Sequence, residues 1–195
     1  MSVSFVTRCR VLGLKWQAMA QLVVGMREAA ILTFHEILAL DSQNIYAMNS
    51  LGYEGLRNKN LPNALQWFER VMLVDAGNSN AQFNLAFTLE ELGRLPEAEK
   101  AFRAAIAIDV KADRAWYGLG LVLVRLGRLD EALASFKHNT KLQPMSPYAW
   151  YQMARVHIDL QQHDEARDVI THLKGFEPKV AAQLERETGI KAMSF

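Results

Sequence analysis

Apolar side chains recur along this chain every three or four residues, with polar ones between them. This is the period of an amphipathic helix. Two segments show the pattern closely, GRLPEAEKAF from Gly93 and GRLDEALASF from Gly127. They begin 34 residues apart, and the same register reaches segments that begin at Gly25, Asn60 and Gln162. No comparable stretch has the period of two that a half-buried strand requires. The pattern therefore predicts pairs of helices repeated every 34 residues or so.

This register divides the chain into repeated units with a segment at either end. We expect an N-terminal extension over 1–10 and a capping helix with a tail over 181–195. The five predicted units are 11–44, 45–78, 79–112, 113–146 and 147–180.

Equivalent positions of the units carry equivalent side chains, as a true repeat requires. One position of each second helix is small enough for close helix contact: Ala30, Ala64, Ala98, Ala132 and Ala166. Four residues later, on the same face, stands a large apolar side chain: Phe34, Phe68, Phe102, Phe136 and Ile170. The first helices carry a second small set: Ala18, Gly52, Ala86, Gly120 and Ala154. Each unit thus offers a small socket and a large plug.

Helix boundary signals agree with two helices per unit. Pro62 and Pro96 fall in the first turn of a second helix, where a missing N–H costs nothing. Polar side chains that cap helix N-termini precede the first helices. These predicted N-caps are Asn44, Asn78, Asp113 and Ser146.

These residues resemble the tetratricopeptide repeat (TPR), a 34-residue helix-turn-helix motif. Unit 113–146 matches that motif best, through Trp116, Leu119, Gly120, Ala132, Phe136 and Pro144. Unit 11–44 matches only through its second helix, because Gln17 and Gln21 occupy places that are normally apolar. The resemblance implies an all-α protein, a right-handed α-solenoid of about five repeats whose first helices form a concave groove.

The segment KVAAQLERETGI, which starts at Lys179, is predicted to be a capping helix after the last repeat. Val180 and Leu184 would point inward, and Gly189 would end the helix.

The face of the first helices opposite their sockets and plugs is unusually rich in aromatic, amide and arginine side chains. A face that contacts only water is expected to be polar, whereas aromatic anchors beside adaptable polar groups are typical of protein-binding surfaces. Packing between neighbouring first helices is the alternative explanation for the rings. The predicted partner-binding residues are Tyr46, Asn49, Tyr53, Asn80, Phe83, Asn84, Phe87, Arg114, Tyr117, Leu121, Tyr148, Tyr151, Gln152 and Arg155.

A carboxylate clamp for acidic tails, as in co-chaperone TPR proteins, is not predicted. Asn84 and Arg114 match two of its elements, but Asn49, Tyr53 and Gly118 stand where Lys, Asn and Arg are needed. An apolar or amphipathic peptide, or a helix, fits these side chains better.

Composition narrows the function classes. The 22 basic and 21 acidic residues argue against a dedicated nucleic-acid surface. A single cysteine, Cys9, excludes an internal disulfide and fits a cytoplasmic protein. The N-terminus is basic but lacks the unbroken apolar run of a secretory signal, so we interpret it as a first helix, with a mitochondrial-type presequence as the alternative. No run suffices for a membrane span.

Catalytic chemistry finds no support in the sequence. The five histidines have no metal-binding spacing, and no glycine-rich phosphate loop is present. We therefore expect no enzyme activity, no cofactor and no metal.

The predicted function is a protein–protein interaction scaffold, an adaptor or chaperone that binds a peptide or helix of a partner in the groove. One alternative is a self-assembling structural subunit, a homo-oligomer acting through its end repeats in a larger secretion, pilus or organelle-assembly apparatus. A regulatory subunit of an enzyme is the third candidate.

Overall fold

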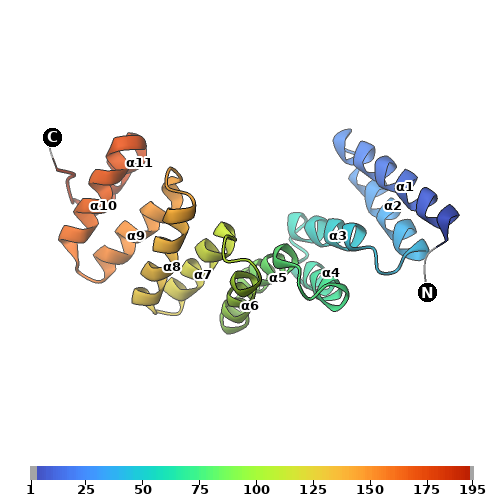
Figure 1. Ribbon diagram of the computed structural model, residues 1–195. Helices are drawn as coiled ribbons and strands as arrows, with labels where there is room; N and C mark the ends of the chain where they lie inside the picture. The colour runs from blue at the N-terminus through green and yellow to red at the C-terminus, as the bar shows by residue number, and fades with distance from the viewer. Residues whose placement is uncertain (1–3, 194–195) are drawn as a thin grey trace. The chain divides into compact units, whose positions relative to one another are not determined.

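The structure is a computed structural model that describes residues 4–193, and these residues form eleven α-helices and no strand (Figure 1). The fold is all-α, as predicted. The helices are α1 (Phe5–Val23), α2 (Arg27–Leu40), α3 (Ile45–Arg57), α4 (Leu61–Val74), α5 (Ser79–Glu91), α6 (Leu95–Ile108), α7 (Asp113–Arg125), α8 (Leu129–Leu142), α9 (Pro147–Asp159), α10 (His163–Phe176) and α11 (Pro178–Thr188).

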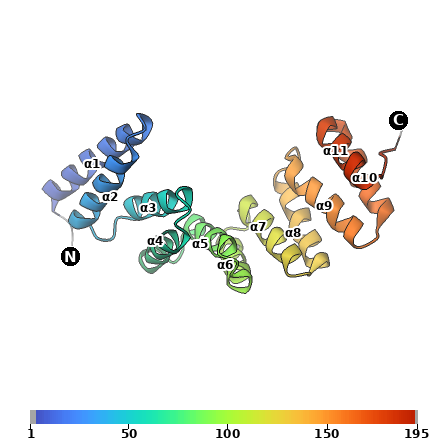
Figure 2. The ribbon, with the colours of Figure 1, turned by 180° about the vertical axis from the view of Figure 1, so that it is seen from behind.

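The chain divides into two compact units, Met1–Gly93 with helices α1 to α5 and Arg94–Phe195 with helices α6 to α11. In the first unit, α1 packs on α2 and α3 on α4, and α5 contacts α4. In the second unit, α7 packs on α8 and α9 on α10, with α6 against α7 and α11 against α10 and α9. Figure 2 shows these pairs from behind. The helix-turn-helix repeat expected from the sequence is therefore present.

The predicted sockets and plugs form the core. The five alanines of the second helices and the four plug phenylalanines are fully buried, as is Ile170. The glycine sockets explain the close approach of the first helices: a Cβ at Gly52 would lie 2.6 Å from the Phe68 ring. Gly120 faces Phe136 in the same way, and Gly118 of α7 faces Phe102 of α6. Any side chain at these glycines would collide with a ring.

The turn between the two helices of each repeat has the same backbone at equivalent positions. The residue there has a positive φ of 82° at Gly25, 75° at Gly93 and 74° at Gly127. Two non-glycine residues adopt it as well, Lys59 at 56° and Gln161 at 60°. A residue with a Cβ is less stable in this left-handed conformation than glycine is.

Three of the four predicted N-caps are correct. Asn44 and Asn78 each accept a backbone hydrogen bond, and Ser146 occupies the cap position without a side-chain bond. The prediction for Asp113 is wrong, because Ala112 is the N-cap and Asp113 begins the helix. The loop carboxylate that accepts a local hydrogen bond is instead Asp109, from the Lys111 N–H at 2.9 Å.

The tryptophans of α7 and α9 anchor the loops that precede these helices. Trp116 Nε1 donates to the Val110 carbonyl and Trp150 Nε1 to the Pro144 carbonyl, each at 2.9 Å. The Trp116 ring stacks on His138 with centroids 4.2 Å apart. Trp150 lies at the same distance from His172. These histidines therefore have a packing role.

Both ends of the chain depart from the repeat. Helix α1 begins at Phe5, inside the predicted extension, and its Gln21 accepts a hydrogen bond from Thr33 of α2 at 2.8 Å. Helix α11 buries Leu184 and is capped after Thr188 by Gly189, whose φ is 74°. Residues 1–3 and 194–195, at the ends of the predicted extension and tail, lie outside the described residues. None of the helices between residues 4 and 193 has the length and apolar character that crossing a bilayer requires.

Candidate functional site

The predicted binding residues of the first unit lie on α3 and α5. Tyr46, Tyr53, Asn80 and Phe87 are exposed there, whereas Phe83 and Asn49 are half-buried. The structure brings α3 and α5 together at one polar contact, where Asn84 Nδ2 donates to Tyr53 Oη at 2.8 Å. Asn84 is only 3% exposed, so its amide orders the tyrosine rather than facing solvent.

The tyrosine rings of this face also pack inward. Tyr46 meets the edge of Phe34 with centroids 5.9 Å apart, and Tyr53 meets Phe68 at 5.7 Å. In the second unit, Tyr117 lies 5.8 Å from Phe136. Each ring thus has one side against a plug phenylalanine. Packing accounts for part of the aromatic content of the first helices, while the exposed edges remain available for contact.

Four of the seven predicted residues of the second unit line a hollow of about 360 Å³ between α7, α9 and α11. Tyr117 comes from α7, while Tyr148, Tyr151 and Gln152 come from α9. The remaining lining residues are Pro147, Val180 and Gln183, the last two from α11. Arg114, Leu121 and Arg155, which complete the predicted set of this unit, are not among the residues that line this hollow.

Helix α11 fixes one wall of this hollow. Tyr151 Oη donates to Glu187 Oε2 at 2.6 Å, and Gln183 Nε2 donates to Glu187 Oε1 at 2.7 Å. The bond to Glu187, aided by burial, raises the pKa of Tyr151, and the same bond lowers the pKa of Glu187. The Arg155 guanidinium lies 5.9 Å from the Tyr151 ring centroid. A second, neighbouring hollow of about 450 Å³ is lined by Arg155, Ile158, Asp159, Glu187 and Thr188.

The sequence did not indicate that α11 contributes to this face. A capping helix was predicted, but only its inward residues were assigned a role. Gln183 and Glu187 lie four residues apart on one face of the helix, and that spacing was the available signal.

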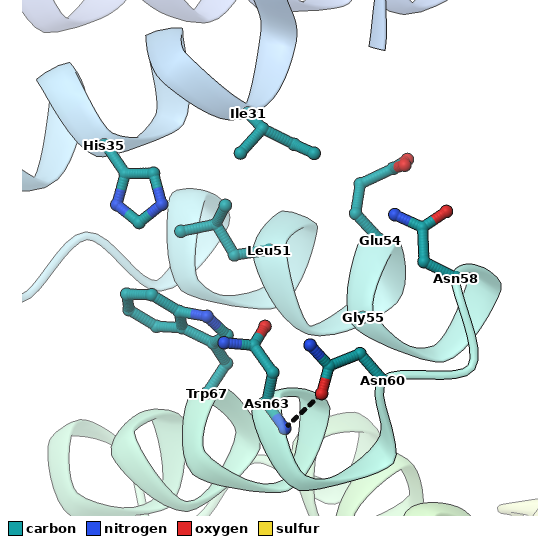
Figure 3. Close-up of a pocket in the computed structure, with 9 residues that line it drawn as sticks. All are labelled: Ile31, His35, Leu51, Glu54, Gly55, Asn58, Asn60, Asn63 and Trp67. Atoms are coloured by element: carbon teal, nitrogen blue, oxygen red, sulfur yellow. Dashed lines mark hydrogen bonds between the residues drawn. The ribbon is translucent and has the colours of Figure 1, made fainter. Parts of the chain in front are cut away.

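A pocket of about 260 Å³ opens between α2, α3 and α4, which the sequence did not predict (Figure 3). Its floor and walls combine apolar groups with amides around a buried carboxylate. The lining residues include Ile31, Leu51, Glu54, Asn58, Asn63 and Trp67. Glu54 Oε1 accepts from Arg27 Nη1 at 2.7 Å, while its buried Oε2 has no hydrogen-bond partner.

Four positions that line this pocket differ in charge from their equivalents in the second unit. The positions 68 residues after Ile31, His35, Asn60 and Asn63 hold four charged residues in the second unit: Glu99, Arg103, Arg128 and Glu131. Arg128 bonds both Glu99 and Glu131 at 2.7 Å, and Arg103 bonds Glu99 at 2.9 Å and Glu131 at 3.0 Å. This charged cluster links α6 to α8. At the equivalent places beside the α2–α4 pocket stand uncharged side chains and one imidazole.

Two of the histidines between residues 4 and 193 have local partners. His157 Nδ1 is hydrogen-bonded to Gln162 at 2.7 Å, and His35 lies against Trp67. Among residues 4–193, no group of three or more His, Cys, Asp or Glu side chains could hold a metal ion. The arrangement offers aromatic edges, amides and isolated charges, which are the means of contacting another chain.

The repeat architecture of this chain resembles that of known proteins. Tetratricopeptide-repeat family models match residues 83–138 and 147–179. No curated protein matches the chain.

Solved structures give the same result for the fold. The structure of MamA shares 20% identity over 88% of this chain and 96% of its own, with a TM-score of 0.75. YrrB, described as a TPR protein with an unusual peptide-binding site, shares 21% identity over 87% and 88%, with a TM-score of 0.74. PilF of Pseudomonas aeruginosa shares 19% over 94% of both chains, with a TM-score of 0.74. At these identities the likeness establishes the fold alone.

The 34-residue register, the socket-and-plug core and both family-model matches agree, and the chain belongs to the tetratricopeptide-repeat family.

Proposed function

We propose that the chain is a protein-interaction scaffold that binds a peptide or helical segment of a partner on the first-helix faces of its units. The observation that carries this proposal is the hollow between α7, α9 and α11, where three tyrosines and Gln152 converge. Tyrosine supplies rigid contact area with a polar end, and the amide can adapt to backbone donors or acceptors.

The chemistry of this hollow favours an amphipathic segment over an acidic tail. Arg155 supplies a cation, but Asp159 and Glu187 line the same neighbouring hollow. A segment with two adjacent carboxylates would meet repulsion from those acids. A ligand with an apolar or aromatic side chain for the tyrosines and a basic group for Glu187 suits the surface better. The peptide-binding site named for YrrB lends support by analogy of fold.

Variants chosen by exposure test this proposal. Tyr148 is 69% exposed, so Tyr148→Ala removes a candidate anchor with little effect on the core. Phe87→Ala removes an anchor on α5, where Phe87 is 38% exposed and its ring stacks on Phe83. Tyr53 is a poor choice, because its removal would deprive buried Asn84 of its acceptor. Val110→Ala is the matched control, an exposed apolar residue in the loop after α6.

The experiment is affinity capture from the native lysate, identification of the partner by mass spectrometry, and titration of that partner against each variant. We expect Tyr148→Ala to weaken binding about tenfold or more, the effect of losing an interface anchor. Val110→Ala should change it less than twofold. Unchanged capture by Tyr148→Ala and Phe87→Ala, with capture abolished by changes on α1, would reject the proposed site.

Self-assembly through an end repeat is a second candidate function, and one observation favours it. Helix α1 exposes several large apolar side chains, among them Phe5, Trp16 and Val23.

A further inference from the structure

The pocket between α2, α3 and α4 lies within the first unit and is separate from the proposed partner-binding face (Figure 3). Its lining residues are different from those predicted to bind a partner on α3 and α5. Three buried residues form its floor, namely Leu51, Glu54 and Gly55. Three exposed residues stand on its rim, namely His35, Asn58 and Asn60. The pocket is thus open to solvent at its rim and has a carboxylate in its floor.

The Glu54 carboxylate has a partner on only one of its two oxygens. Its side chain is 9% exposed, and Oε1 accepts a hydrogen bond from Arg27 Nη1 at 2.7 Å. Oε2 is buried and has no hydrogen-bond partner among residues 4–193. A buried charged oxygen without a partner is unfavourable. A ligand group that donates a hydrogen bond to Oε2 is therefore favoured in this pocket.

The second unit shows which kind of group completes a largely buried glutamate in this chain. Glu99 of α6 is 15% exposed, and both of its oxygens accept from a cation: Oε1 from Arg103 at 2.9 Å and Oε2 from Arg128 at 2.7 Å. Arg128 stands at the place that corresponds to Asn60 on the rim of the pocket. By this comparison, the group missing from Glu54 Oε2 is a second cation.

One free oxygen suits an ammonium better than a guanidinium. A guanidinium binds most strongly when it pairs with both oxygens of a carboxylate, and Arg27 already occupies one. An ammonium is a compact charge with three donors. The side-chain amides of Asn58 and Asn63 line the pocket and supply acceptor oxygens for the other two donors. Figure 3 shows the Asn58 amide beside the Glu54 carboxylate, and this exposed side chain is free to turn aside for the ligand.

The walls and the size of the pocket suit the stem of a lysine side chain. Ile31, Leu51 and Trp67 supply apolar surface, along which a lysine buries its methylene groups while its charged end stays among polar groups. The volume of about 260 Å³ is below the range of pockets for drug-sized ligands, so one side chain fits it better than a large molecule. We propose that this pocket binds an alkylammonium group, carried by a lysine side chain of a partner protein or by a free amine with the same stem.

Heteronuclear NMR of the full chain tests the site, with the indole N–H of Trp67 as the reporter. The probe is Nα-acetyl-lysine N-methylamide. We expect saturable shifts at Trp67 with a dissociation constant on the order of 1 mM, as for other ligands of this size. The indole signals of Trp116 and Trp150, in the second unit, should not move.

A matched ligand isolates the contribution of the ammonium. Nα-acetyl-norleucine N-methylamide has the same four-carbon stem and no charge. It should bind to the unmodified chain about tenfold more weakly than the lysine derivative, because it has no donor for Oε2.

A pair of variants locates the charge that the ligand contacts. Glu54→Gln keeps the shape of the side chain and removes its charge, so it should weaken binding of the lysine derivative about tenfold or more. Glu69→Gln is the matched control, because Glu69 is an exposed acid of α4 that does not line the pocket. It should bind the lysine derivative as the unmodified chain does. Circular dichroism verifies that Glu54→Gln is folded, and the comparison of the two ligands on the unmodified chain decides the question if it is not.

A third ligand identifies the source of the ammonium. Cadaverine is lysine without its carboxyl group, so it has the same stem and no peptide amides. Tighter binding of the lysine derivative assigns the pocket to a lysine side chain of a protein, and tighter binding of cadaverine assigns it to a free amine. Either order supports the ammonium site.

Three results would overturn the proposal. Equal affinity for the lysine and norleucine derivatives would show that water or Asn58 is sufficient as the partner of Oε2. Absence of any shift at Trp67 would show that the pocket does not admit the ligand. A loss of binding in Glu69→Gln as large as that in Glu54→Gln would show non-specific attraction to the acidic residues of the unit. None of these results bears on the partner-binding face, which Tyr148→Ala tests separately.

Discussion

Asn84 Nδ2 donates a hydrogen bond to Tyr53 Oη at 2.8 Å, which links α5 to α3 across the first unit. The amide is buried and the tyrosine is about half exposed. This bond therefore contributes to the packing between repeats and also orients a side chain on the face where a partner is proposed to bind.

The Tyr53→Phe variant should lower the free energy of unfolding. Asn84 would lose the acceptor for a buried N–H, and an unsatisfied buried donor costs about 1–3 kcal/mol. Tyr148→Phe, which removes an exposed hydroxyl, should change stability by less than about 0.5 kcal/mol. Urea unfolding followed by circular dichroism measures both. Equal stability of the two variants would show that the Asn84 bond contributes nothing.

The Gly52→Ala substitution should destabilise the chain despite the higher helix propensity of alanine. Its Cβ would lie 2.6 Å from the Phe68 ring, so the buried ring must shift, at a cost of about 1–3 kcal/mol. Gly175→Ala in α10 is the control, because a Cβ there has no neighbour within 4 Å. It should raise stability by up to about 1 kcal/mol. Thermal unfolding of both variants should give shifts of opposite sign.

Glycine should stabilise the two repeat turns that lack it. Lys59 and Gln161 have φ values of 56° and 60°, where a Cβ is unfavourable. Lys59→Gly and Gln161→Gly should each raise the free energy of unfolding by about 0.5–1 kcal/mol. The reverse change, Gly127→Ala, should lower it by about 1 kcal/mol, because φ there is 74°. Loss of stability in both glycine variants would contradict this account of the turns.

The charged cluster between α6 and α8 should make the second unit sensitive to acid. Hydrogen bonds from Arg128 lower the pKa of Glu131. At Glu99, burial acts to raise the pKa, but the hydrogen bonds from Arg103 and Arg128 outweigh burial and lower the pKa of that carboxyl. A carboxyl whose pKa falls on folding stabilises the native state above its unfolded pKa, ordinarily 4.5. This stabilisation is lost as the pH falls through the lower folded-state pKa.

The measurement for this prediction is NMR titration of the glutamate side-chain carboxyls. Glu131 and Glu99 should titrate below the ordinary glutamate value, and Arg128→Gln should move both upward. Arg167, which pairs with Asp164 elsewhere in the unit, provides the control. Arg167→Gln should leave Glu131 and Glu99 unchanged. Titration of Glu131 at its ordinary value would show that the cluster is not maintained in solution.

Repetition made most of the fold predictable. A side chain that recurs every 34 residues, such as Phe34, Phe68, Phe102 and Phe136, reveals its burial without any knowledge of its neighbours. Helix starts were less certain, since the N-cap of α7 is Ala112, one residue before the predicted Asp113.

The proposed surfaces were harder to predict from the sequence. Asn84 was expected to face a ligand, and it is buried beneath Tyr53 because side chains on neighbouring first helices lie within hydrogen-bond reach. Tyr151 was assigned to the binding face without its partner, because Glu187 is 36 residues away and the pairing depends on how α11 packs on α9.

The sequence by itself determined the helices, their pairing into repeats and the residues of the core, because these follow from short-range periodicity and from a register repeated along the chain. Tertiary structure alone decided which polar side chains are already engaged, as with Arg10 and Glu36, and which apolar ones are uncovered, as with Trp16. Whether a side chain is paired or exposed depends on groups that are distant in the chain, and helical periodicity does not show which of those groups lie close in space.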